Sequence, residues 1–182
     1  MTPADLVYIN LLREIKSEGN IRPSRNHPVQ SHFGLPVVTF DSFPLVTVRK
    51  TAWKLAIREM EWFLSGESKC PDDLSEWWGG QLSPKGCYYG GYGNQFRDFN
   101  EHFDQVAELI DSIKGHPFSR RLVLTAWNPA EMAVITKLNE NEKTPTTCHT
   151  TLAQFYVCNN NLSMKSYQRS ADMLLEVPHN WA

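Results

Sequence analysis

Residues 166–182 read SYQRSADMLLEVPHNWA and hold the most informative side chains of the chain. A strand-like run leads into Gln168-Arg169-Ser170, and Cys148 with His149 lies upstream of it. A thiol, a guanidinium, a hydroxyl and a side-chain amide are therefore close together in the sequence. Such an inventory suits covalent attack on a flat, anionic heterocycle such as a nucleotide base.

The bulk composition is that of a soluble globular protein. The 182 residues are 41% apolar and 21% charged, with a net charge of −2. We expect one domain over 1–182, and the near-neutral charge argues against a nucleic-acid or anionic membrane surface. No apolar run approaches the ~20 residues of a membrane-spanning helix. The four cysteines have no paired spacing, which favours a reduced, cytoplasmic protein over a disulfide framework.

Hydrophobic periodicity and turn residues together predict an α+β fold, a mixed β-sheet packed with helices. The predicted elements are helices over 3–18, 52–64 and 101–114, strands over 37–40, 45–48, 122–127, 150–157 and 162–168, and a short helix near Pro178. We expect a polar loop over 20–34, a turn at Asn159-Asn160-Asn161 and an excursion over 129–145.

Residues 66–98 are rich in glycine and aromatic side chains, with Trp77-Trp78 followed by Tyr88-Tyr89 and Tyr92. A flexible linker is one interpretation of this stretch. Linkers rarely carry so many large aromatic residues, so we favour a binding loop over a flat ligand.

Cys148 has two interpretations. Most lone cysteines are packed as small hydrophobic residues. Cys148, however, neighbours His149 and opens a strand whose partner strand carries Arg169, and a nearby cation favours the nucleophilic thiolate. A zinc site that combines these residues with Cys158 matches no strong ligand spacing, so we expect no metal.

The arginines and Glu59 also have two interpretations each. Arg25, Arg120-Arg121 and Arg169 would bind a phosphate dianion if they converged, whereas each alone would be a solvated surface charge. Glu59 lies in an apolar helical run. It is either a partly buried proton-transfer group with a raised pKa or an exposed charge, and periodicity slightly favours the exposed interpretation.

The chain resembles the thymidylate synthases and the related phage-type pyrimidine nucleotide hydroxymethylases from about Leu11 to Ala182. The motifs that carry this resemblance occur in the family's order and are specific as a set. They are Phe43-Pro44-Leu45-Val46-Thr47, Glu59-Met60-Glu61-Trp62-Phe63-Leu64 with Gly66, Ser119-Arg120-Arg121, Ala126-Trp127-Asn128, Cys148-His149, Tyr167-Gln168-Arg169-Ser170 with Asp172, and Leu175, Val177-Pro178 and Asn180.

The resemblance implies folate-dependent C5 methylation of dUMP to dTMP, with 5,10-methylenetetrahydrofolate as co-substrate and no metal. Cys148 would add to uracil C6, and Glu59 would organise water and proton transfer. The remaining site residues implied by the resemblance are His149, Tyr92 and Trp78 near the nucleophile, Arg25, Arg120, Arg121, Arg169, Ser170 and Gln168 at the nucleotide, Asn180 at uracil N3 and O4, and Asp172 and Trp78 at the folate. A homodimer is also implied, in which Arg120 and Arg121 serve the neighbouring subunit.

Several positions depart from the family pattern. Thr147 replaces a proline before Cys148, and Glu176 replaces a glycine. The step from Cys148 to Gln154 is six residues long, where five are usual, and one extra residue would turn Cys148 to the other face of its strand. We therefore predict a β-bulge between Cys148 and Gln154. The family also continues beyond the position of Ala182, so the chain is expected to lack the family's C-terminal portion.

Two other functions stay open. In a hydroxymethylase acting on dUMP or dCMP, water would trap the same covalent intermediate. A non-catalytic nucleotide-binding relative would use the aromatic stretch and the arginines for binding alone.

Overall fold

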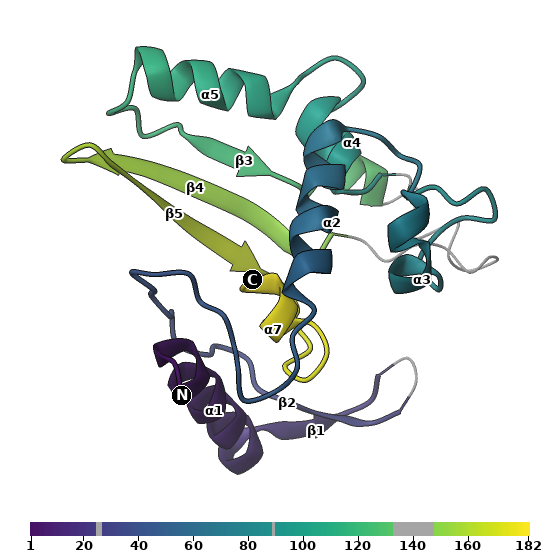
Figure 1. Ribbon diagram of the computed structural model, residues 1–182, viewed down its shortest axis with the longest axis vertical. Coiled ribbons are helices and arrows are strands. Elements are labelled where there is room, and N and C mark those ends of the chain that lie inside the picture. Colours follow the sequence, from purple (N-terminus) through teal and green to yellow (C-terminus); the bar gives the residue numbers. More distant parts are fainter. Residues whose placement is uncertain (25–26, 89, 133–147) are drawn as a thin grey trace. The chain divides into compact units, whose positions relative to one another are not determined.

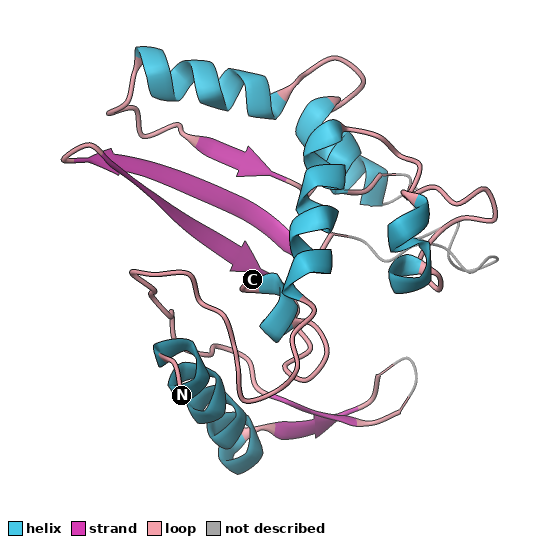
Figure 2. Cartoon of the chain, in the orientation of Figure 1, coloured by secondary structure: helices cyan, strands magenta, loops and turns pink. Residues whose placement is uncertain are grey.

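The structure is a computed structural model that describes residues 1–24, 27–88, 90–132 and 148–182. In these residues helices combine with two antiparallel sheets, which confirms the predicted α+β class (Figure 2). The chain divides into two compact units, Met1–Ile57 with Asp172–Ala182 and Arg58–Ala171, and each is described by itself. A single domain over 1–182 stays a prediction.

The first unit begins with the helix α1 (Pro3–Glu18), as the periodicity predicted. Thr2 forms a capping box, because its hydroxyl accepts from the Asp5 N–H and its own N–H donates to the Asp5 carboxylate. Such a cap satisfies backbone donors that the first helical turn leaves free. The helix ends at Gly19, whose N–H donates to the Ile15 carbonyl.

The predicted strands over 37–40 and 45–48 are wrong, since neither range forms a strand. The Asp5 carboxylate accepts hydrogen bonds from the N–H groups of Thr47 and Val48, at 2.6 and 3.0 Å, and from the Thr47 hydroxyl. A side chain thus takes donors that a neighbouring strand would have used. Burial favours the neutral acid, but these hydrogen bonds outweigh it and lower the pKa of Asp5.

The expected loop over 20–34 contains a short hairpin instead. Strand β1 (Asn20–Arg22) pairs antiparallel with β2 (Val29–Ser31). The Gln30 amide donates to the carbonyls of Lys16 and Gly19, so a polar side chain ties the hairpin to the end of α1. These strands could not be predicted from the alternation of apolar and polar residues, because the segment is largely polar and contains proline.

The core of the first unit joins distant parts of the chain. Ala4, Tyr8, Val46 and Val177 are buried together, and Trp181 packs on them. Val177 begins the helix α7 (Val177–Asn180), which confirms the short helix expected near Pro178.

The second unit is built on a three-stranded antiparallel sheet in the order β3-β4-β5 (Figure 1). Its strands are β3 (Val123–Thr125), β4 (Thr150–Cys158) and β5 (Asn161–Gln168), close to the predicted ranges. Asn159 and Asn160 join β4 to β5 with positive φ angles of 49° and 59°. Asparagine tolerates this left-handed conformation, which a two-residue hairpin turn requires.

Helix α5 (Gln105–Gly115) lies beside β3 in Figure 1. Gln105 fixes that contact, since its side-chain amide donates to the Thr125 carbonyl and accepts from the Thr125 N–H. The helix starts later than the predicted 101, because Asp104 is its N-cap and accepts from the Ala107 N–H. Most of the expected excursion over 129–145 lies outside the described residues.

The stretch 66–98 is not one continuous loop. It contains η1 (Asp72–Leu74), α3 (Ser75–Trp78) and α4 (Tyr92–Arg97). Its aromatic rings pack on helix α2 (Trp53–Ser65), which confirms the predicted helix over 52–64. The resulting aromatic cluster consists of Trp62, Phe63, Trp78, Tyr88 and Tyr92, all buried. Most of the stretch thus packs into the core, and its role as a binding loop over a flat ligand stays a prediction.

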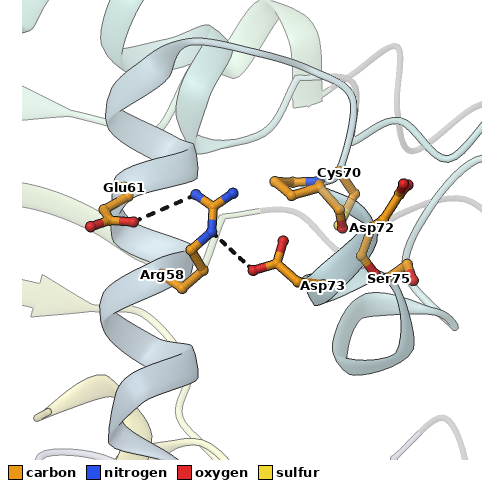
Figure 3. A network of polar contacts seen from close by, with 7 residues as sticks. Arg58, Glu61, Cys70, Asp72, Asp73 and Ser75 are labelled. Atoms are coloured by element: carbon orange, nitrogen blue, oxygen red, sulfur yellow. Dashed lines mark hydrogen bonds and ion pairs between the residues drawn. The ribbon is translucent and has the colours of Figure 1, made fainter.

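Arg58 ties α2 to η1 on the solvent side. Its Nε atom lies 3.0 Å from an Asp73 oxygen, and Glu61 lies 3.5 Å from another guanidinium nitrogen (Figure 3). Exposed ion pairs of this kind add little stability, about 0–1 kcal/mol. The solvated face that the sequence indicated around Glu59 thus consists of Arg58 and Glu61.

Candidate active site

The predicted β-bulge is present in β4. Thr150 pairs with Gln168 and Leu152 pairs with Tyr167, so Thr151 is the extra residue in the register. The Thr151 carbonyl accepts from the Ala126 N–H and the Thr125 hydroxyl, which anchors the bulge to the end of β3. Because side chains alternate along a strand, this one-residue shift restores the direction that Cys148 would otherwise lose.

Cys148 lies directly before β4 and is completely buried, with 0% of its surface exposed. Its sulfur is 3.8 Å from the Tyr88 hydroxyl and 4.0 Å from the Gly90 carbonyl oxygen. Burial raises the pKa of the Cys148 thiol to about 12, although the Tyr88 hydrogen bond and the Arg169 charge act in the opposite direction. The nearby cation therefore favours the thiolate as expected, but burial has the larger effect.

Arg169 follows β5 and is joined to Cys148 through the backbone. Its Nε donates to the Cys148 carbonyl at 3.1 Å, and its backbone N–H donates to the His149 carbonyl at 2.9 Å. The guanidinium carbon lies 5.2 Å from the centre of the Trp127 ring, a cation–π contact. The structure thus brings together two of the predicted site residues, and an exposed cation stands next to a buried thiol.

Tyr92 holds the backbone on the C-terminal side of Cys148. Its hydroxyl oxygen accepts from the N–H groups of His149 and Thr150, at 3.0 and 2.9 Å. The rings of Tyr92 and His149 meet edge to face, with centroids 6.0 Å apart. Burial is the main cause that raises the pKa of Tyr92, so this phenol stays protonated. Tyr92 therefore lies next to the Cys148-His149 segment, while its part in a reaction stays a prediction.

Gln168 and Ser170 flank Arg169 in sequence. The Gln168 amide donates to the Thr150 hydroxyl at 3.2 Å, which joins the ends of β5 and β4. Ser170 is exposed directly after Arg169. Both lie beside the Cys148 segment, within the second unit.

Glu59 is half-buried in α2, which corrects the slight preference for an exposed side chain. One carboxylate oxygen accepts from the indole N–H groups of Trp78 and Trp77, at 2.6 and 3.1 Å. Burial raises the pKa of Glu59, and the two indole hydrogen bonds oppose that rise. Such a carboxyl is suited to hold or release a proton nearer to neutral pH.

Three contacts connect Glu59 with Cys148. Glu59 bonds to Trp78, the rings of Trp78 and Tyr88 have centroids 4.9 Å apart, and Tyr88 reaches the sulfur. Trp78 is thus enclosed between the carboxylate and the tyrosine. From the sequence, Tyr88 was recognisable only as part of the aromatic stretch. Its contact with the Cys148 sulfur could not be predicted, because spacing along the chain does not place it beside Cys148.

Arg120 and Arg121 are both exposed, in the turn before β3. In the part of the chain that the structure describes, neither forms an ion pair with an acidic side chain. Among the described residues of the second unit, no hydrogen bond or ion pair connects either arginine with Cys148. Arg25 lies outside the described residues.

Asp172 and Asn180 belong to the first unit. One Asp172 oxygen accepts from the N–H groups of Leu174 and Leu175, at 2.8 and 2.9 Å. Glu176, at the family's glycine position, accepts from the Asp172 N–H at 3.0 Å, so it closes this turn. Asn180 is exposed in α7.

One group of side chains in the described part of the chain has metal-ligating atoms close together. Glu14, Glu18 and His32 have such atoms within 4.8 Å of one another in the first unit. Exposed acidic groups of this kind are common without a metal. The residues around Cys148 include no such group among those described.

In the described residues, every helix is too short or too polar to cross a lipid bilayer.

Comparisons with known proteins identify the family. The sequence model of the family described as Thymidylate synthase matches residues 6–182. The chain is 36% identical over 189 residues to the Thymidylate synthase of Francisella philomiragia subsp. philomiragia. This match covers 96% of the chain and 68% of that protein.

Two plant proteins are also similar, the Bifunctional dihydrofolate reductase-thymidylate synthases 2 and 1 of Arabidopsis thaliana. Each is 32% identical over 211 residues and matches 98% of this chain. The chain spans only 35% and 38% of their lengths.

Proposed function

Because the chain belongs to the thymidylate synthase family, we propose that it methylates C5 of dUMP and releases dTMP. The co-substrate is 5,10-methylenetetrahydrofolate, which supplies the one-carbon unit and the hydride that completes the methyl group. The relatives support this reaction, since one is named as a thymidylate synthase and the other two as bifunctional dihydrofolate reductase-thymidylate synthases.

The observation that carries the proposal is the setting of Cys148. A buried thiol lies 3.8 Å from a phenol, and its own carbonyl accepts from a guanidinium. A thiol with a pKa of about 12 is almost fully protonated at neutral pH, so it is inert toward solvent. Attack then requires a substrate that reaches the buried sulfur, and groups that stabilise the thiolate as it forms.

In the proposed reaction the Cys148 sulfur forms a bond to uracil C6, and its proton leaves to water or a neighbouring base. The electron pair moves through the ring and makes C5 nucleophilic. After C5 has bonded to the one-carbon unit it loses its proton, and the bond between that carbon and the folate nitrogen breaks, so that an exocyclic methylene remains on C5 and tetrahydrofolate departs. A hydride from tetrahydrofolate then completes the methyl group and leaves dihydrofolate, while the S–C6 bond breaks and the Cys148 thiolate takes up a proton. Glu59 is the group that handles protons here, because burial raises its pKa toward neutral.

The nucleotide is recognised through its phosphate and its base. We assign the phosphate to Arg25, Arg120, Arg121 and Arg169 with Ser170, since guanidinium groups bind phosphate through paired hydrogen bonds. Asn180 reads uracil, because an amide offers both a donor and an acceptor to N3 and O4. Gln168 supports the base through its bond to Thr150.

The residues assigned to the folate fit it in part. Oδ1 of the Asp172 carboxylate is occupied by two backbone N–H groups, whereas no hydrogen bond to Oδ2 is found in the described residues. A carboxylate oxygen accepts from pterin N–H groups. Trp78 is buried behind Glu59, so it supports the carboxylate rather than offering a free ring face. Asp172 is therefore the better folate ligand of the two.

The working form is proposed to be a homodimer. One face of the β3-β4-β5 sheet carries Val123, Leu152, Tyr156 and Tyr167, all exposed, with Tyr156 exposed by 65%. Exposed apolar side chains gathered on one face of a sheet, here around the polar Gln154 and Lys165, suit an interaction surface. Arg120 and Arg121 stand at the entrance of this sheet and would reach the neighbouring subunit's nucleotide. A mixture of Arg121→Ala and Cys148→Ser subunits should then regain activity that neither variant has, whereas subunits complete in themselves would regain none.

The decisive experiment is covalent capture. With 5-fluoro-dUMP and methylenetetrahydrofolate, one equivalent of adduct should form on Cys148, identified by peptide mass spectrometry. Cys148→Ser should form none, and Cys158→Ser, a control at an exposed cysteine, should label like the wild type. Absence of an adduct on wild-type Cys148 would favour the non-catalytic nucleotide-binding relative.

Hydroxymethylation is separated by its products. Release of dihydrofolate and dTMP indicates methylation, whereas tetrahydrofolate with a hydroxymethyl nucleotide indicates that water trapped the intermediate. We also propose a cytoplasmic location, which four free cysteines favour, and no nucleic-acid partner, in keeping with a net charge of −2.

A further inference from the structure

Tyr88 makes a side-chain contact with the Cys148 sulfur. The two atoms lie 3.8 Å apart, and both residues are buried, with 4% and 0% of their surfaces exposed. We propose that Tyr88 is a positioning residue that donates a hydrogen bond to the Cys148 thiolate and so makes the nucleophile available. The inference rests on the proposed function for its link to turnover, but the contact itself does not.

Packing determines where the Tyr88 hydroxyl lies. The ring meets Trp78 and Trp62, with centroids 4.9 and 6.3 Å apart, and the Tyr88 N–H donates to the Ser68 carbonyl. Gly91 closes the remaining side. A Cβ atom added there would stand 2.2 Å from a Tyr88 ring carbon, so only glycine leaves room for the ring. A ring held by this many contacts cannot swing its hydroxyl away from the sulfur at low cost.

Chemistry determines the direction of the hydrogen bond. Burial raises the pKa of Tyr88 well above its usual value, so the phenol keeps its proton when the thiol ionises. The contact with Tyr88 in turn lowers the pKa of Cys148, against the larger effect of burial. Once the sulfur is charged it accepts and the phenol donates. A charge-assisted bond of this kind is stronger than a neutral one.

Tyr92 does not replace Tyr88 in this role. Its hydroxyl oxygen accepts from the N–H groups of His149 and Thr150, and no hydrogen bond from Tyr92 to the sulfur occurs within the described residues. Arg169 also favours the thiolate through its charge, but its Nε donates to the Cys148 carbonyl. Tyr88 is therefore the side-chain O–H donor aimed at the sulfur in the described part of the site.

The test compares Tyr88→Phe with the wild type and with Tyr8→Phe, a control at a buried tyrosine of the first unit whose hydroxyl donates to the Met173 carbonyl. Phenylalanine keeps the ring packing and removes only the hydroxyl. Loss of one charge-assisted donor should move the acid limb of the pH profile of kcat/KM to higher pH by roughly one to two units. At a fixed pH on that limb, kcat/KM should fall about 10- to 100-fold. The control should leave the profile unchanged. A variant that lowers kcat/KM equally at every pH would overturn the inference, because a packing defect acts in that way.

A second measurement needs neither nucleotide nor folate. The S–H stretching band of Cys148 is isolated by Raman difference against Cys148→Ser. It should shift in Tyr88→Phe toward the frequency of a thiol without a hydrogen bond and should stay in place in Tyr8→Phe. An unchanged band in Tyr88→Phe would overturn the inference. A shifted band in a protein without dUMP turnover would leave the contact established and reject the proposed function instead.

Discussion

Deletion of Thr151 should make Cys148 unreactive toward a nucleotide inhibitor and reactive toward a simple alkylating agent. The bulge at Thr151 is the feature that turns the thiol toward Tyr88, since Thr150 pairs with Gln168 while Leu152 pairs with Tyr167. Without the extra residue an unbroken ladder would point Cys148 to the opposite, exposed face. We expect the variant to lose covalent capture by 5-fluoro-dUMP, yet to gain reactivity toward a simple alkylating agent.

The size of the gain follows from the thiol pKa. Burial raises it from 9.0 to about 12, so exposure would lower it by about three units. At pH 8 the thiolate fraction would then rise roughly a thousandfold, and iodoacetamide labelling with it. Labelling is read for each cysteine by peptide mass spectrometry. Cys70, which is buried and distant in sequence, reports whether the variant is folded, because it stays protected only in a folded chain.

Thr151→Val is the matched control, because it keeps the residue count and the carbonyl that β3 contacts. It should capture the inhibitor and label slowly, like the wild type. If the deletion variant protects Cys70, still forms the adduct and leaves Cys148 slow to label, the register does not orient the thiol and the argument from the bulge is refuted.

Glu59→Gln should lower kcat by about 10²- to 10⁴-fold with little change in the dUMP dissociation constant, measured by steady-state kinetics and calorimetry, because it removes a proton carrier and keeps the shape. Asn180→Asp should shift preference from dUMP toward dCMP, as the ratio of kcat/KM for the two nucleotides would report, and an unchanged ratio would remove Asn180 from base recognition. Asp5→Asn should lower the urea midpoint at pH 7. The lowered pKa of Asp5 means that its stabilisation is complete well above the usual value of 3.8 and is lost as the pH falls below that value, so the wild type should weaken progressively from about pH 5 downward and the variant should weaken less.

Local patterns predicted the regular elements well where burial follows one period. The helices at residues 3–18 and 52–64 and the strands of the hairpin over 150–168 were confirmed within a few residues, because each buries one face at helical or strand spacing. The bulge was also predictable, since a register argument needs only the count of residues between two positions that must face the same way.

The same patterns failed where long-range polar contacts decide the backbone. The apolar run over 45–48 resembles a strand, but the buried Asp5 carboxylate binds its N–H groups and no strand pairs with it in the described part of the chain. Glu59 looked exposed by periodicity, yet two tryptophans from a later helix cover and bond it. Neither partner lies within the window over which periodicity is measured.

By itself, the amino-acid sequence determined the α+β class and the family, because these follow from local spacing and from motifs in order, and it singled out Cys148 as the candidate nucleophile. Only the tertiary structure decided how far the pKa of the Cys148 thiol is raised and which side chain lowers it again. Both depend on burial and on a phenol brought to the sulfur from 60 residues away. Distances of that kind arise from packing, and packing is a property of the whole fold.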